Sequence, residues 1–175
     1  SAASGAGVPV ADDRELAPTG TLRVLTIDRK QRNRNPAPPF TTSTLQQEAA
    51  RKLGLSAQRT MRLAQQLYEG VAYMRTDAVN LANEAIGEIR GVIAKLYGAD
   101  SVPEAPRYFK NKSRNAQEAH EAIRPTSAAV TPQLLEGRID NDLHRLYTLI
   151  WKRAVACQMT HAVFDTCLLY TSPSP

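Results

Sequence analysis

A phenol, a guanidinium and a carboxylate alternate in Tyr73, Arg75 and Asp77, within the segment Glu69–Asp77. Alternate side chains of an extended segment point to the same side, so these three would share one face. Tyrosine forms covalent catalytic intermediates, and a guanidinium binds phosphate oxygens through two parallel N–H donors. The face therefore suits a nucleophile held against a phosphate. The alternative is an ordinary edge strand with a surface Tyr–Arg pair, and a motif this short does not separate the two.

Length and composition set wide bounds on what the chain can be. Its 175 residues, 42% of them hydrophobic and 22% charged, suit one globular domain, or one domain plus part of another. The net charge of +5 is compatible with a nucleic-acid partner without establishing one. Cys157 and Cys167 lack the spacing of metal ligands or of a disulfide framework. No run has the length of a membrane span and no signal peptide is recognisable, so we expect a cytoplasmic protein without membrane contacts.

The first ordered elements should be a strand followed by a stiff boundary. Thr21–Ile27 alternates and is rich in β-branched residues, which predicts a strand. The basic segment Asp28–Asn35 is either a strip that contacts phosphates or a solvated strand end or linker. Three prolines in Pro36–Pro39 exclude helix and strand pairing alike and indicate a boundary.

Two short helices are predicted beyond this boundary, starting from Thr41. Ser43 and Gln46 have capping-box spacing, Gly54 is a suitable helix end, and Ser56 can cap the second helix. The pattern is that of a helix-turn-helix. It permits either a duplex-binding motif or an antiparallel helix pair with no role in DNA binding.

Three further helices should follow. One has its apolar face on Ile86, Ile89, Ile93 and Leu96, and Gly98 is placed as a left-handed stop. Another opens at Thr131-Pro132. The longest covers 140–158, with Trp151 as a packing anchor and Cys157 as a small core residue. Its buried stripe should consist of Leu143, Leu146, Tyr147, Ile150, Ala154 and Cys157. A strand should begin at Thr160–Phe164.

Two more segments carry groups that could bind DNA. Ala99–Arg114 is a proline-containing loop with basic residues around Tyr108-Phe109, which suits either a nucleic-acid groove or a plain surface loop. In Ala116–Thr126, His120 and Arg124 would lie one turn apart if the segment were helical. The alternative there is a packing turn of small residues with a surface histidine.

Several stretches, taken together and in order, resemble bacterial type IA DNA topoisomerases, and their Ser43–Gln47 form is closer to topoisomerase I than to topoisomerase III. The stretches are Pro39–Ala49, Ala64–Gly70, Tyr73–Asp77, Ala116–Pro125, Leu149–Trp151 and Ala156–Met159. The resemblance extends from about Arg29 to Phe164.

This resemblance implies roles for individual residues. Tyr73 would be the nucleophile that cuts one DNA strand and forms a 5′-phosphotyrosyl link, and Arg75 would contact the scissile phosphate. His120 would lie near the DNA backbone. The further residues to which we assign DNA contacts are Asp77, Arg124, Gln47 and Glu69. The enzyme would pass the other strand and reseal without ATP, relaxing negatively supercoiled DNA.

The resemblance also implies Mg²⁺, bound by an acidic cluster in a separate toprim domain. We assign no metal ligand in this chain, so it should be a fragment that is inactive alone. The segment between Glu69 and Tyr73 is shorter than is usual in the family. The rival interpretations are a non-catalytic helix-turn-helix module that binds DNA and reverse gyrase, which shares the core but adds a helicase region.

The predicted fold is mainly α with short β segments: a helical type IA topoisomerase domain containing a helix-turn-helix, flanked by strands of a β-rich arch domain. Residues 1–36 would end the arch domain, 37–158 would form the tyrosine-bearing helical domain, and 159–165 would be a return strand. Residues 166–175 continue no pattern and are expected to be a non-native tail. We expect a nucleoid-associated monomer whose partner is single-stranded or negatively supercoiled DNA.

Overall fold

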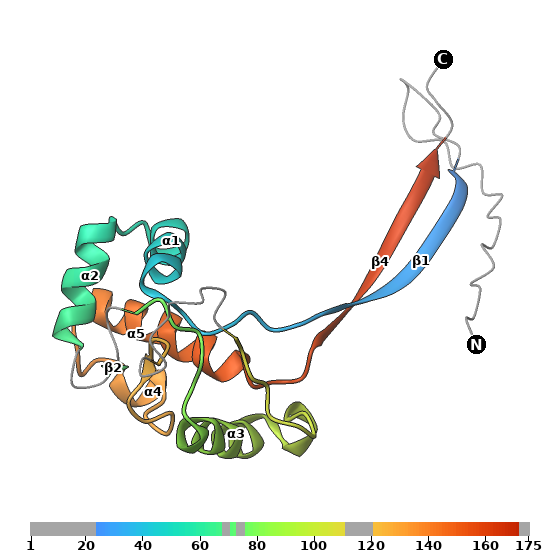
Figure 1. The fold of residues 1–175 in the computed structure, drawn as a ribbon. Coiled ribbons are helices and arrows are strands. Elements are labelled where there is room, and N and C mark those ends of the chain that lie inside the picture. Colours follow the sequence, from blue (N-terminus) through green and yellow to red (C-terminus); the bar gives the residue numbers. More distant parts are fainter. Residues whose placement is uncertain (1–23, 68–70, 73–75, 111–120, 172–175) are drawn as a thin grey trace. The chain divides into compact units, whose positions relative to one another are not determined.

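In the part of the chain that the structure describes, helices make up most of the regular structure, and two small antiparallel sheets accompany them (Figure 1). The computed structural model describes residues 24–67, 71–72, 76–110 and 121–171. Internal contacts divide the chain into two units. Unit 1 contains the described residues up to Asn35 and from His161 onward, and unit 2 is Pro36–Thr160.

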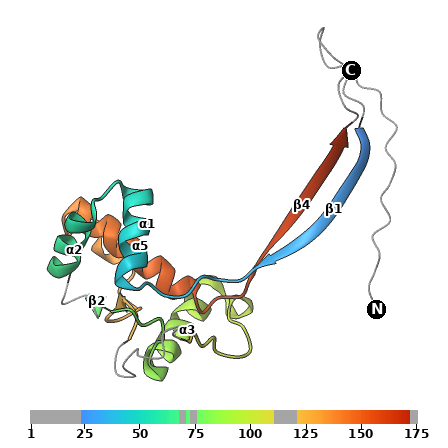
Figure 2. The ribbon, with the colours of Figure 1, turned by 45° about the horizontal axis from the view of Figure 1, so that its top comes forward.

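Unit 1 is a two-stranded antiparallel ribbon of β1, Val24–Arg34, and β4, Ala162–Thr171. The strands lie side by side in both Figure 1 and Figure 2. Strands were predicted at both places, but with shorter bounds. β1 continues into the basic strip as far as Arg34, because these residues pair with β4, from Asp28 opposite Leu168 to Arg34 opposite Ala162. The strip is therefore exposed strand and not linker, and β4 includes residues of the segment that was expected to be a tail.

Unit 2 begins with α1, Thr42–Leu53, and α2, Ala57–Gln66. Ser56 caps α2 and Gly54 ends α1 at φ 70°, both as predicted. The predicted capping box of Ser43 and Gln46 is wrong. Thr41 is the cap, because Thr44 at the third helical position accepts a hydrogen bond from the Thr41 N–H, while the Thr41 side chain accepts one from the Thr44 N–H.

The later helices are α3, Asn83–Tyr97, the 3₁₀ turn η1, Ala99–Ser101, α4, Pro132–Leu135, and α5, Asn141–Ala156. Pro132 opens α4 as predicted. Ile86, Ile89 and Ile93 are buried on α3, but Leu96 is 47% exposed, because the last turn of the helix extends beyond the core. Gly98 has a positive φ of 88° with ψ at 157°, so it ends α3 outside the left-handed helical region that was predicted.

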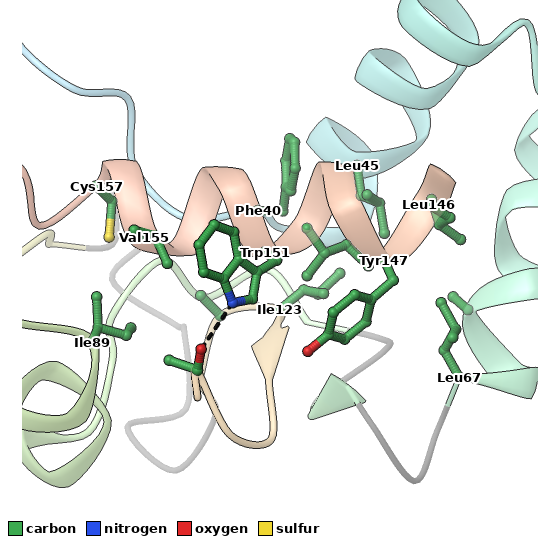
Figure 3. Packing of buried hydrophobic residues seen from close by; sticks show 14 of the residues in the cluster. Phe40, Leu45, Leu67, Ile89, Ile123, Leu146, Tyr147, Trp151, Val155 and Cys157 are labelled. Carbon is green, nitrogen blue, oxygen red and sulfur yellow. Dashed lines mark hydrogen bonds between the residues drawn. The ribbon is translucent and has the colours of Figure 1, made fainter. Parts of the chain in front are cut away.

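The core of unit 2 is organised around α5, which contacts α1, α2, α3, α4 and the short strand β3, Arg124–Pro125. Figure 3 shows its apolar face among residues from the other elements. Trp151 Nε1 donates to the Ala128 carbonyl at 2.9 Å, and the Tyr147 hydroxyl donates to the Val130 carbonyl at 2.6 Å. The buried polar ends of both aromatic side chains are thus satisfied by one loop. The predicted stripe is confirmed apart from Leu143, which is only half-buried.

Candidate functional site

The predicted nucleophile motif is anchored at both of its ends. Tyr73 and Arg75 themselves lie outside the described residues, as do Glu69 and His120. The described residues on either side of Tyr73 and Arg75 are β2, Val71–Ala72, and the segment that starts at Thr76. These anchors fix the backbone on either side of the motif.

The upstream anchor is an antiparallel pairing of β2 with β3. Val71 lies opposite Pro125, and Ala72 lies opposite Arg124. The stretch 69–77 was expected to be one short extended strand; of its described residues, Val71–Ala72 form a strand, and Thr76 and Asp77 do not. The pairing joins two stretches that are about fifty residues apart in the sequence, so the residue before Tyr73 is held beside Arg124.

The downstream anchor is a set of hydrogen bonds between Thr76 and Thr42, the first residue of α1. The Thr42 N–H donates to the Thr76 carbonyl at 2.9 Å, and the Thr76 N–H donates to Thr42 Oγ1 at 2.8 Å. Thr76 is 7% exposed, and its own hydroxyl accepts from the Ala78 N–H at 3.0 Å. The residue after Arg75 is thereby fixed to the start of a helix.

The segment that follows the predicted histidine lies between two other parts of the chain. The Ala122 N–H donates to the Asn80 carbonyl at 2.9 Å, and the Ile123 N–H donates to the Phe40 carbonyl at 2.8 Å. The helical alternative considered for this stretch is wrong for its described residues, 121–126. Their backbone donors bond to distant carbonyls and not to carbonyls four residues back, which a helix would require.

Arg124 is held by protein groups on several sides. Its Nη2 lies 2.8 Å from Glu121 Oε2, and its Nη1 donates to the Pro125 and Thr126 carbonyls at 3.1 and 3.4 Å. The two side chains of the pair are 16% and 12% exposed. Glu121 also accepts a short hydrogen bond from the Ala82 N–H, next to the first residue of α3. A DNA contact by Arg124 stays a prediction, and a phosphate would have to share this guanidinium with Glu121.

The other two predicted contact residues are both exposed. Asp77 follows Thr76 directly, and Gln47 lies on α1. The Thr42–Thr76 bonds bring the Asp77 segment to the start of the helix that carries Gln47. The sequence did not single out Thr42 or Glu121, although both lie within stretches that carry the family resemblance.

Several basic residues near α1 share one carboxylate within the fold. Glu48 lies 2.6 Å from Arg51, 3.1 Å from Lys52 and 3.7 Å from Arg153. The Lys52 ammonium, together with Arg51, lowers the pKa of Glu48 below its usual value. Burial lowers the pKa of Arg153, whose guanidinium lies 4.3 Å from the centre of the Phe40 ring. The net positive charge is therefore not all available to an external anion.

The described residues do not fit a magnesium site. Within residues 24–67, 71–72, 76–110 and 121–171, no group of three or more His, Cys, Asp or Glu side chains could hold a metal ion. Asp140 and Asp142 have Asp-x-Asp spacing, but the Asp140 side chain caps α5, and Asp142 pairs with Arg59 and Arg145. The same described part of the chain contains no helix long and apolar enough to cross a membrane.

Known proteins similar to this chain agree on one family. A family model described as DNA topoisomerase matches residues 13–172. The DNA topoisomerase 1 of Xylella fastidiosa is 52% identical over 158 residues, which cover 84% of this chain and 19% of that protein. The DNA topoisomerase 1 of Rickettsia felis is 54% identical over 149 residues, covering 79% and 19%.

A solved structure supports the same relationship. The full-length topoisomerase I of Thermotoga maritima superimposes with a TM-score of 0.70 at 37% identity, over 85% of this chain and 25% of that one. The chain spans about a fifth of the length of the curated relatives named above. Sequence and fold together show that the chain belongs to the type IA, topoisomerase I family of bacterial DNA topoisomerases.

Proposed function

We propose that this chain is the tyrosine-bearing part of a longer, ATP-independent topoisomerase, and that Tyr73 attacks a phosphodiester of one DNA strand. The observation that carries the proposal is the double anchoring of the Tyr73 motif in a chain of this family. β3 holds the residue before Tyr73, and Thr42 holds the residue after Arg75. Such fixed ends suit a nucleophile that must meet a phosphate in one geometry.

The chemistry follows from the two side chains. A phenol has a pKa of about 10, so nearby positive charge assists its attack at neutral pH. The Tyr73 hydroxyl gives up its proton and its oxygen forms a bond to phosphorus while the bond from phosphorus to the 3′ oxygen breaks, and the 3′ oxygen takes up a proton and leaves as a hydroxyl. Arg75 would hold the phosphate through parallel N–H donors. Attack by the 3′ hydroxyl reverses the step, so resealing needs no ATP.

The wider activity would come from the longer enzyme. Passage of the intact strand through the break would relax negative supercoils, with single-stranded DNA at the cleavage site. The Mg²⁺ ligands would lie in a toprim domain of that enzyme, and this chain alone would cleave DNA poorly. We place the enzyme in the cytoplasm, at the nucleoid, as a monomer.

The test is to trap the covalent intermediate. The longer enzyme containing this chain is incubated with a single-stranded oligonucleotide labelled at its 3′ end, then denatured and run on a gel. A labelled protein band is expected for the wild type and is expected to be absent for Tyr73→Phe. Tyr97→Phe is the matched control, because Tyr97 is a 50% exposed tyrosine at the end of α3 in the same unit, and it should keep the band. An undiminished band from Tyr73→Phe would overturn the assignment.

A further inference from the structure

Thr42 bonds to Thr76 through both its backbone and its side chain. The Thr42 N–H donates to the Thr76 carbonyl, and the Thr76 N–H donates to Thr42 Oγ1. In addition, the Thr42 hydroxyl donates to the Thr76 carbonyl at 3.2 Å. One threonine thus bonds to both the N–H and the carbonyl of the residue that follows Arg75. These residues are 34 positions apart, so no local turn accounts for the arrangement.

The position of Thr42 in α1 explains why this contact is favourable. As the first helical residue, Thr42 has an N–H without a carbonyl partner inside the helix, and the Thr76 carbonyl supplies one. Thr76 is buried, so its peptide groups have little access to water, and losing a buried partner costs more than a solvated bond contributes. The hydroxyl of Thr42 therefore fixes the peptide groups on both sides of Thr76.

We propose that Thr42 is a positioning residue for DNA cleavage, which orients Arg75 and Tyr73 by fixing the Thr76 backbone. This inference rests on the proposed function. Thr42 Oγ1 accepts from the Thr76 N–H, which belongs to the peptide bond between Arg75 and Thr76. The orientation of this peptide bond therefore depends directly on the Thr42 hydroxyl. The hydroxyl itself should matter for the rate of cleavage and not for the affinity for DNA.

Three substitutions in the longer enzyme separate this role from a general loss of stability. Thr42→Val keeps the size and branching of the side chain and removes the hydroxyl. Thr42→Ser keeps the hydroxyl and should restore the rate. Thr60→Val is the matched control, because Thr60 is a buried threonine of α2 whose hydroxyl donates to the Ser56 carbonyl at 2.9 Å, within its own helix.

Two measurements test the proposal. Single-turnover cleavage of a single-stranded oligonucleotide should slow by about tenfold or more in Thr42→Val, because a small misplacement of reacting groups is costly, while the Kd for the oligonucleotide stays the same. Thr42→Ser and Thr60→Val should cleave close to the wild-type rate. Hydrogen exchange of the Thr76 amide should accelerate in Thr42→Val alone.

The outcomes distinguish failure of this inference from failure of the proposed function. Wild-type cleavage in Thr42→Val, or an equal loss in Thr60→Val, would overturn the positioning role. Unchanged Thr76 exchange in Thr42→Val would overturn the anchor itself, and this readout needs no cleavage. If Tyr73→Phe still forms the covalent adduct, the proposed nucleophile is wrong whatever the Thr42 variants do.

Discussion

Glu121 should be a main stabilising residue of the segments that surround the Tyr73 motif. Its carboxylate pairs with Arg124 and accepts from the Ala82 N–H, so it links β3 to the start of α3. Glu121→Ala would leave the Arg124 guanidinium, 16% exposed, and the Ala82 N–H without this partner. Glu121→Gln would keep an oxygen acceptor for Ala82, but it would replace the carboxylate oxygen that faces Arg124 with an amide N–H donor.

The expected magnitude follows from the burial of the pair. Breaking a fully buried ion pair costs about 3–5 kcal/mol, whereas a solvent-exposed pair contributes about 0–1 kcal/mol. The two side chains retain a little exposure, at 16% and 12%, which places Glu121→Ala at about 2–3 kcal/mol. Glu121→Gln should lose about 1–2 kcal/mol, since it keeps the hydrogen bond to Ala82.

The assay is urea unfolding of this chain, followed by the fluorescence of Trp151, the one tryptophan of the sequence and a buried residue of α5. Glu136→Gln is the control, because Glu136 is exposed beyond α4. A double-mutant cycle of Glu121→Gln with Arg124→Met should give a coupling of about 1–2 kcal/mol. A Glu121→Ala midpoint equal to that of the Glu136 control, or a coupling of zero, would refute the reasoning.

Three smaller predictions concern other parts of unit 2. Gly54→Ala should lower the free energy of unfolding by about 1 kcal/mol through backbone strain, because φ at this position is 70° and an added Cβ meets no atom within 4 Å. An unchanged urea midpoint would contradict this prediction. Burial raises the pKa of the Cys157 thiol from 9.0 to about 12. Above pH 9 the unfolded state therefore loses a proton that the folded state keeps, and the free energy of unfolding should fall as pH rises. Cys157→Ala should weaken this fall in urea titrations between about pH 8 and about pH 11, and an equally steep fall would count against a buried neutral thiol. Trp151→Phe should cost about 1–3 kcal/mol in thermal unfolding, because it leaves the Ala128 carbonyl without its donor, and an unchanged Tm would show that this hydrogen bond contributes little.

Local patterns in the sequence predicted those elements that local interactions determine. Gly54 and Ser56 end one helix and begin the next as their residue types suggest. The start of α1 was harder, because Thr41–Thr44 offers four hydroxyl residues in a row, and any of them suits a cap. The structure selects Thr41, whose N–H bonds to Thr44.

Long-range partners account for what the sequence did not reveal. The helical alternative for the segment around Glu121 failed because its backbone donors bond to the Phe40 and Asn80 carbonyls, which no local pattern reveals. The Thr42–Thr76 bonds are hidden for the same reason. Leu96 fits the apolar spacing of α3, but spacing alone does not show where the core ends along a helix.

The identity of the residue that becomes attached to DNA tests the central claim most directly. The covalent adduct of the longer enzyme can be digested with nuclease and protease, and the nucleotide-bearing peptide sequenced by mass spectrometry. We predict a 5′-phosphate nucleotide on the Tyr73 side chain and none on Tyr108. Attachment at any other residue, or the absence of an adduct from an enzyme that still relaxes supercoiled DNA, would contradict the account.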